Sequence, residues 1–188
     1  MGKKSFNYTI EPWITTNEQV EYTTKIFKVI SREMMLETEK HSANFSIIDS
    51  LDWTNVMALT PDNDVILVEQ YRYGIEKPTL EFPGGICDEG EKPLESSKRE
   101  LLEETGFSSI DWVSLGNVSS NSAMLNNYTH FYLARNCVQT SQQKLDGNER
   151  INVHKMPLIE FLDMVRKGDI EHSLVVAAVA KFLLSEYS

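Results

Sequence analysis

The sequence has little of several features that define common protein classes. Its two cysteines, Cys87 and Cys137, do not form a CxxC pair, so neither a disulfide framework nor a zinc site is expected. No stretch is apolar over the roughly 20 residues that a membrane-spanning helix needs. The segment Met1–Asn7 lacks the apolar core of a signal peptide. These absences favour a cytoplasmic protein without a membrane partner.

Basic residues are also scarce relative to acidic ones. The chain has 18 Lys and Arg against 28 Asp and Glu, a formal net charge of −10. This balance argues against a general nucleic-acid or membrane-surface binder. An anionic substrate would need a divalent cation to bridge it to so acidic a protein. With 188 residues, 41% of them hydrophobic, the chain is long enough for one domain with a small appendage.

The most informative positive feature is a set of three glutamates. Glu100, Glu103 and Glu104 are spaced i, i+3, i+4, which places them on one face of a helix. Three carboxylates there repel one another unless a positive charge lies between them. Carboxylate oxygens suit Mg²⁺ or Mn²⁺, and such sites leave positions for water and substrate phosphates. The pattern indicates metal-assisted phosphate chemistry; the alternative is the solvated acidic side of an amphipathic helix.

Short β-prone runs and later helical patterns predict a mixed α/β layered domain. Pro93 and Gly106 suit the start and the stop of the helix that carries the glutamates. The last helical pattern is apolar on most sides, which predicts that it packs well into the fold. The expected elements are β-prone runs at 22–30 and 45–48, a hairpin of 54–60 and 65–70, the helix from Pro93, strands at 131–134 and 151–154, and helices at 157–167 and 173–184.

Residues 85–107 match a known signature over its whole length. The matching residues are Gly85, Glu91, Arg99-Glu100, Leu101, Glu103-Glu104, Gly106 and Phe107, each at the required spacing. The segment is identified as a Nudix box, so the chain resembles the Nudix hydrolases. Residues 68–74 and 80–85, together with a leading section of about fifty residues, resemble the ADP-ribose and nucleotide-sugar pyrophosphatase branch. This broader likeness covers most of the chain but is less specific than the box.

The resemblance implies a fold and a domain arrangement. It implies an α/β/α sandwich around a mixed β-sheet for residues 51–188, which would form the Nudix hydrolase domain. Residues 1–50 would form a small N-terminal β-subdomain that helps to build a homodimer.

The resemblance also implies a metal site that holds Mg²⁺ or Mn²⁺. Glu100 and Glu104 match the family's principal carboxylate ligands, Glu103 matches a third, and the carbonyl of Gly84 matches a further ligand. Two more residues match supporting positions. Glu91 supports the site or is simply an acid at a helix N-terminus, and Arg99 orients Glu91 or Glu100 through charge-assisted bonds without touching substrate.

Two further roles follow from the resemblance. Arg72 matches an arginine that contacts a substrate phosphate or terminal ribose, a task that suits guanidinium geometry; its alternative is a structural ion pair. Glu69, on the same stretch, is a weaker substrate-binding candidate. In this branch a carboxylate on a late loop orients or deprotonates the attacking water. Within residues 141–150 the candidate general base is Glu149, with Asp146 as the alternative.

The implied activity is hydrolysis of the diphosphate linkage in a nucleoside diphosphate sugar such as ADP-ribose, giving a nucleoside monophosphate and a sugar phosphate. Residues 120–127 depart from the family pattern, because they contain no proline and Asn127 takes an acidic position. That departure leaves other small-molecule substrates open: GDP-mannose, dinucleoside polyphosphates or an oxidised nucleotide. A different class of function, a sensor that binds a nucleotide sugar without cleaving it, is the remaining alternative.

Overall fold

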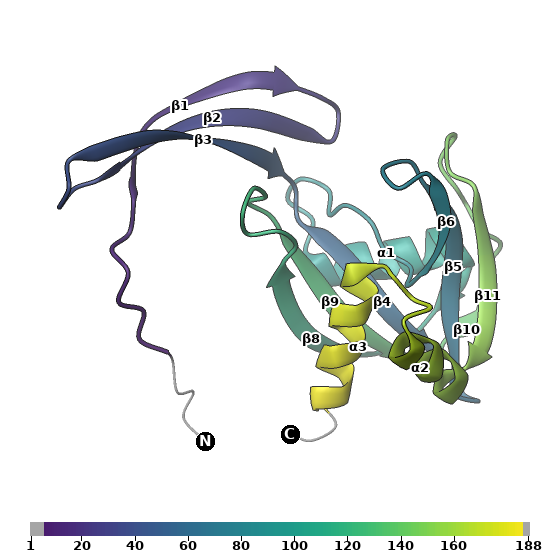
Figure 1. The fold of residues 1–188 in the computed structure, drawn as a ribbon. Coiled ribbons are helices and arrows are strands. Elements are labelled where there is room, and N and C mark those ends of the chain that lie inside the picture. Colours follow the sequence, from purple (N-terminus) through teal and green to yellow (C-terminus); the bar gives the residue numbers. More distant parts are fainter. Residues whose placement is uncertain (1–5, 186–188) are drawn as a thin grey trace. The chain divides into compact units, whose positions relative to one another are not determined.

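The computed structural model describes residues 6–185, and its contacts divide the chain into two compact units (Figure 1). One unit comprises the chain up to Ser50 together with Asn121–Asn126, and the other comprises Leu51–Ser120 and the chain from Asn127 onward. Most of the segment Met1–Asn7, for which the sequence predicts no signal-like core, lies outside the described residues.

The first unit is built on an antiparallel sheet of β1 (Ile14–Thr23), β2 (Phe27–Leu36) and β3 (His41–Ser50), in that order. The prediction of one β-prone run over residues 22–30 is wrong, because the chain turns between β1 and β2. The Thr24 hydroxyl accepts the N–H of Phe27 at 2.9 Å and fixes that turn. Residues 121–126 join this unit through Ile48, whose N–H donates to the carbonyl of Met124 at 2.7 Å.

The second unit contains a mixed sheet with helices on both faces. Its strands follow the order β11-β5-β4-β9-β8, with β6 also paired to β5; β4 and β9 are parallel and the other pairs antiparallel. A short pair, β7 (Phe107–Ser108) and β10 (Val138–Gln139), lies beside this sheet. The strand bounds are β4 Trp53–Leu59, β5 Asp64–Arg72, β6 Lys77–Glu81, β8 Asp111–Ser119, β9 Tyr128–Arg135 and β11 Ile151–Pro157.

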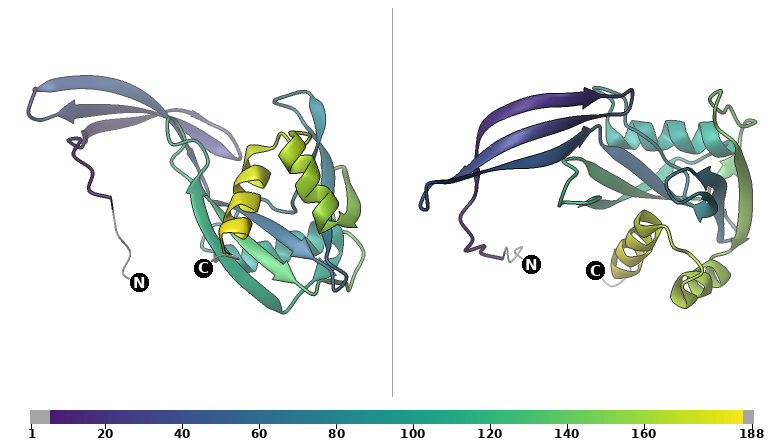
Figure 2. Two further views of the ribbon diagram at one scale, coloured as in Figure 1. Left: turned by 60° about the horizontal axis from the view of Figure 1, so that its bottom comes forward. Right: turned by 45° about the horizontal axis from the view of Figure 1, so that its top comes forward.

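Helix α1 (Pro93–Thr105) covers one face of the mixed sheet, and α2 (Leu158–Lys167) with α3 (Ser173–Ser185) covers the other (Figure 2). Side chains alternate along a strand, so Ile66 of β5 packs toward α1 whereas its neighbour Leu67 packs toward α2 and α3. Both faces of the sheet are therefore buried. The predicted mixed α/β sandwich is confirmed.

The predicted helix ends match the structure. Pro93 opens α1, and Gly106 closes it in the left-handed conformation with φ 75°, its N–H donating to the Leu102 carbonyl at 2.8 Å. Helix α3 is only partly enclosed: Phe182 is buried, whereas Leu183 is exposed. The expectation of a well-packed last helix therefore holds for one side of it.

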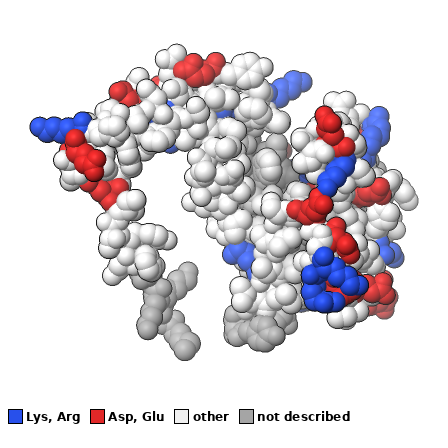
Figure 3. Space-filling model, in the orientation of Figure 1, with Lys and Arg blue, Asp and Glu red and all other residues white. Residues whose placement is uncertain are grey.

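On the face shown in Figure 3, Lys and Arg lie next to Asp and Glu over α2, whereas a broad central area carries no charged side chain. On α2, for example, Asp163 pairs with Arg166 and with Lys167. Within the described part of the chain, no helix is both long and apolar enough to cross a bilayer.

Candidate active site

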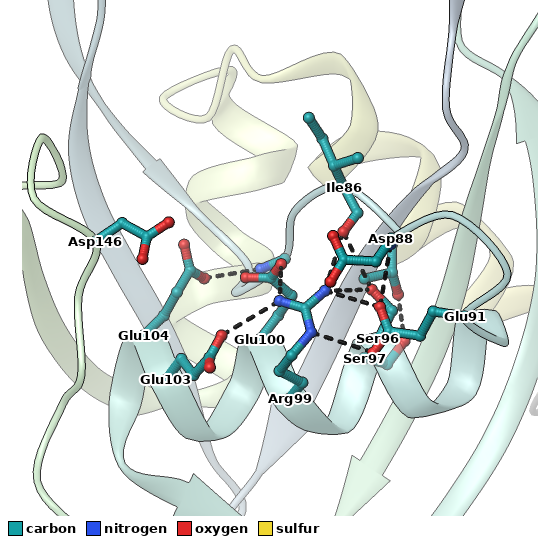
Figure 4. Close-up of polar contacts among 12 residues, drawn as sticks. Ile86, Asp88, Glu91, Ser96, Ser97, Arg99, Glu100, Glu103, Glu104 and Asp146 are labelled. Atoms are coloured by element: carbon teal, nitrogen blue, oxygen red, sulfur yellow. Dashed lines mark hydrogen bonds and ion pairs between the residues drawn. The ribbon is translucent and has the colours of Figure 1, made fainter. Parts of the chain in front are cut away.

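Helix α1 presents Glu100, Glu103 and Glu104 on one side, as their spacing predicts (Figure 4). Their exposure differs because Leu101, between them in the sequence, is fully buried against the sheet. Glu104 is 4% exposed, and the side chain of Glu100 is 13% exposed against 37% for Glu103. The two glutamates expected to bind metal most strongly are thus the two that lie nearest the protein interior.

Arg99 joins several of the predicted site residues. Its Nη1 donates to Glu100 Oε1 at 2.7 Å and to Glu103 Oε2 at 3.2 Å, while Nε and Nη2 donate to the two oxygens of Glu91 at 3.1 and 2.9 Å. These bonds raise the pKa of Arg99 and lower the pKa of Glu91. Glu91 also accepts the N–H of Asp88 at 3.1 Å, which ties the loop before α1 to the helix.

Glu104 has a different environment. Among residues 6–185, no Lys or Arg side chain bonds to its carboxylate. Its Oε2 accepts the N–H of Gly84 at 2.8 Å. Burial raises the pKa of Glu104 to about 8, and the charges of Glu100 and Glu149 add to the increase. Burial also raises the pKa of Glu100, despite the opposing effect of Arg99. Two buried carboxylates that resist ionisation would both gain from a nearby cation.

The loop before α1 brings backbone atoms to the same place. The carbonyls of Pro83 and Gly85 accept hydrogen bonds from Val56 and Thr54 of β4, each at 2.8 Å, and Gly84 lies between them. A Cβ on Gly85 would lie 2.6 Å from Glu100 Oε1. The absence of a side chain there allows the Glu100 carboxylate to lie directly against the loop backbone.

The donor set can be tested against the predicted metal. Among residues 6–185, no three His, Cys, Asp or Glu side chains already converge as a metal-binding group. Glu100 and Glu103 bond to Arg99, and Glu104 bonds to Gly84. Within the same residues, Glu100 Oε2 and Glu104 Oε1 accept no hydrogen bond. Free carboxylate oxygens are ligands that Mg²⁺ and Mn²⁺ favour, so the chemistry of these residues fits such an ion.

The loop before β11 is attached to the C-terminal end of α1. Gln143 Nε2 donates to the Glu104 carbonyl at 2.6 Å, and the N–H of Lys144 donates to the Glu103 carbonyl at 2.8 Å. A Cβ on Gly106 would clash with the Ser141 carbonyl, so this approach also needs glycine. Gln143 could not be predicted from the sequence, since nothing in a polar loop distinguishes one glutamine from another.

This loop carries both candidates for the general base. Glu149 Oε2 accepts the N–H of Asp146 at 2.9 Å. The charge of Glu149 raises the pKa of both Glu100 and Glu104, so the loop brings it within electrostatic range of the two buried carboxylates. Figure 4 shows Asp146, on the loop before β11, beside Glu104.

Arg72, at the end of β5, forms an ion pair on the α1 side of the sheet. Its Nε and Nη2 donate to the two oxygens of Glu81, at 2.7 and 2.6 Å. The charge of Glu104 contributes to raising the pKa of Arg72, which places the guanidinium near the α1 carboxylates. No role for Glu81 was predicted from the sequence. An acidic residue within the otherwise apolar run before Pro83 was the available signal.

Glu69 does not lie near Arg72 and the α1 carboxylates. It lies three residues before Arg72 on β5, so alternation places the two side chains on opposite faces of the sheet. Its Oε2 is bonded to His154 at 2.7 Å and to Asn152 at 3.4 Å, both on β11.

Asn127, the residue at the departure from the family pattern, is 2% exposed. Its Nδ2 donates to the Leu51 carbonyl at 3.0 Å, and its buried Oδ1 has no partner among the described residues. A neutral amide thus occupies an interior position where an aspartate or glutamate would carry an unpaired charge.

Comparison with known proteins accords with this geometry. The NUDIX domain model matches residues 52–178, a range that contains α1, the loop before it and the late loop. The chain belongs to the Nudix family. This Nudix protein is accordingly classed as a pyrophosphohydrolase.

Two relatives and one solved structure describe its neighbours. The chain is 31% identical over 132 residues to a methanol dehydrogenase activator of Bacillus methanolicus, covering 70% of this chain and 71% of that one. It is 24% identical over 179 residues to an ADP-ribose pyrophosphatase of Bacillus subtilis (strain 168), covering 95% and 96%. The crystal structure of an ADP compounds hydrolase shares the fold, with a TM-score of 0.79, 23% identity and 96% coverage of both chains. The resemblance to the ADP-ribose pyrophosphatase branch is confirmed.

Proposed function

We propose that this Nudix protein hydrolyses the diphosphate linkage of nucleoside diphosphate sugars, with ADP-ribose as the first candidate. The observation that carries the proposal is the pair of buried carboxylates, Glu100 and Glu104, whose pKa values are both raised. They lie on the helix of a Nudix box, near Arg72. The name of the Bacillus subtilis relative, whose similarity extends over 95% of this chain, supports the choice of ADP-ribose.

In the proposed mechanism, Glu100 and Glu104 would hold Mg²⁺ or Mn²⁺ together with Glu103 and the Gly84 carbonyl. A cation bound there would offset the charge of the diphosphate and lower the pKa of a water molecule. Arg99 holds Glu91, Glu100 and Glu103 in place.

Glu149 orients or deprotonates the attacking water, and Arg72 donates to a phosphate oxygen. The water oxygen forms a bond to one phosphorus atom as the bridging P–O bond breaks. ADP-ribose and water would thus give AMP and ribose 5-phosphate.

A substrate panel tests this proposal. ADP-ribose, GDP-mannose, a diadenosine polyphosphate and an oxidised nucleoside triphosphate would each be incubated with Mg²⁺, with Mn²⁺ and with EDTA, and the products separated by chromatography. We expect the highest kcat/KM for ADP-ribose and no products in EDTA.

The neutral Asn127 favours a second candidate, another nucleoside diphosphate sugar, which a higher kcat/KM for GDP-mannose would establish. Tight binding without products, even after long incubation with metal, would instead identify a sensor.

We also propose that the protein acts in the cytoplasm as a homodimer formed through residues 1–50. Both cysteines are free and buried, which suits a reducing compartment. Exposed apolar side chains on the first unit, such as Val20, Tyr22 and Phe45, support an interface there. Sedimentation velocity of the full chain would give the oligomeric state, and a monomer at micromolar concentration would reject this part of the proposal.

A further inference from the structure

Glu81 is a buried acid with an unusually complete set of partners. It is 1% exposed, and its Oε1 accepts both Arg72 Nε at 2.7 Å and the Thr79 hydroxyl at 2.6 Å. Its Oε2 accepts Arg72 Nη2 at 2.6 Å and lies 3.4 Å from His172 Nε2. Buried ion pairs are weak evidence of stabilisation, because desolvation offsets their attraction. A role in fixing orientation is the more specific explanation of this arrangement.

The arrangement leaves one side of Arg72 available. The Nε and Nη2 groups face Glu81, while Nη1 has no hydrogen-bond partner among the described residues. The side chain of Arg72 is 43% exposed, whereas that of Glu81 is 1% exposed. Because a guanidinium is planar, fixing one edge with two bonds fixes the direction in which the opposite edge points.

The connection between α2 and α3 also holds Glu81 in place. His172 lies between α2 and α3, and its neighbour Glu171 forms an ion pair with Lys77 at the start of β6. This pair holds the α2–α3 connection against β6, the strand that carries Glu81. Glu81 is therefore held by its own strand, by β5 and by the α2–α3 connection.

We propose that Glu81 is a positioning residue that fixes the guanidinium of Arg72 with its Nη1 edge directed at the substrate diphosphate. The inference rests on the proposed function in one respect: it takes Arg72 as a contact of the diphosphate. Glu81 itself does not touch substrate, since both of its oxygens are occupied and it is buried.

A double-mutant cycle tests the proposal. In Glu81→Gln the negative charge is lost and an NH₂ group replaces one of the two acceptor oxygens. One of the two Arg72 donors then faces another donor, and the bidentate pair is broken. We expect KM for ADP-ribose to rise about tenfold, with kcat changed less than about threefold. In an Arg72→Ala background the same substitution should change KM less than about twofold, because there is no guanidinium left to position. Equal effects of Glu81→Gln in both backgrounds would overturn the proposal.

Two further variants test whether the change in KM comes from a general loss of structure. Thr79→Val removes one bond to Glu81 while keeping the ion pair, and it should raise KM in the same direction by about twofold to threefold. It provides the test if Glu81→Gln fails to fold, and an unchanged KM would then count against the proposal. Asp163→Asn, which breaks exposed ion pairs on α2, is the matched control and should leave KM unchanged.

A binding measurement separates the inference from the proposed function. Calorimetry with inorganic pyrophosphate and Mg²⁺ needs no turnover. Affinity should fall about tenfold when Glu81→Gln is introduced into the wild type, but should change less than about twofold when it is added to Arg72→Ala. If no substrate is hydrolysed yet this pattern appears, the proposed function fails and the positioning role stands. If ADP-ribose is hydrolysed but the two substitutions are additive in both assays, the positioning role fails and the proposed function stands.

Discussion

Glu81 and Glu104 are both almost fully buried acids of the same compact unit, yet their pKa values shift in opposite directions. Burial opposes ionisation at both. At Glu81 burial is the largest single effect, but the hydrogen bonds and charge of Arg72 together with Thr79 and His172 outweigh it, and the pKa falls below its ordinary value. At Glu104 the N–H of Gly84 does not outweigh it, and the pKa rises to about 8. Within residues 6–185, Arg72 pairs directly with Glu81, whereas no Lys or Arg pairs directly with Glu104. That difference distinguishes a completed ion pair from a candidate cation site.

Removing a carboxylate from the α1 cluster should give the largest effect. Glu100→Gln should lower kcat/KM about a thousandfold, because a ligand of the proposed metal is lost. The free energy of unfolding should be unchanged or higher, since an amide costs less to bury than an ionised acid. Activity assays and urea unfolding would measure the two quantities.

The matched control for that substitution is Glu95→Gln. Glu95 lies on the same helix but is mostly exposed, and it pairs with Lys98 at 2.9 Å. Its variant should retain wild-type turnover. Wild-type turnover in Glu100→Gln would show that the α1 carboxylates are no more than a buried acidic cluster.

The loop before β11 adds to this contrast, because the charge of Glu149 raises the pKa of Glu104, whereas the charge of Arg72 lowers the pKa of Glu81. Glu149→Gln should reduce kcat about a hundredfold if it is the general base, whereas Asp146→Asn should change kcat less than about threefold. Steady-state kinetics at saturating metal would measure both. The reverse order of effects would assign the base to Asp146.

The two buried acids should also give opposite contributions to stability as the pH changes. In EDTA, the native state holds a proton on Glu104 between its unfolded pKa of 4.5 and about 8, so the free energy of unfolding should fall as pH rises through that window. The slope for one group is at most about 1.4 kcal/mol per pH unit. Glu81, with a lowered pKa, stabilises the fold above 4.5, and this stabilisation is lost only as pH falls below 4.5 toward its folded pKa.

Urea unfolding of the wild type and Glu104→Gln at pH 5, 6, 7 and 8 measures this contribution. The decline should be less steep in the variant, where only the raised pKa of Glu100 still contributes to it, and Mg²⁺ should reduce the decline in the wild type. An identical slope in both proteins would show that Glu104 ionises normally in the folded state.

The smallest expected effect comes from the attachment of the late loop. Gln143→Ala removes the bond to the Glu104 carbonyl and should lower kcat about fivefold, with little change in stability, because Glu149 is held less firmly. Gln142→Ala is the neighbouring control, since no described hydrogen bond involves its side chain. Equal rates for the two variants would mean that this bond does not position the base.

The elements that could be predicted from the sequence depend on short-range patterns. Helix α1, its proline start and its glycine stop follow from spacing and from backbone preferences, and so does the common face of its glutamates. The partner of Glu81 could not be predicted. In the register of β5 and β6, Glu81 lies opposite Val68 and Arg72 lies opposite Lys77, so the ion pair forms only because the long Arg72 side chain reaches Glu81 along the same face. The turn between β1 and β2 was also missed, since threonine and isoleucine favour strands, and the bond from the Phe27 N–H to the Thr24 hydroxyl is visible only in the structure.

Residues 121–126 have a practical consequence for anyone who shortens this chain. They belong to the first compact unit although they lie between β8 and β9, and Asn126 Nδ2 donates to Asp49 Oδ1 at 2.6 Å. No single cleavage point therefore yields the two units as separate polypeptides. A fragment beginning at Leu51 would keep residues 121–126 but lose β3, the strand to which they bond. Low stability of such a fragment would therefore not show that the second unit depends on dimer formation.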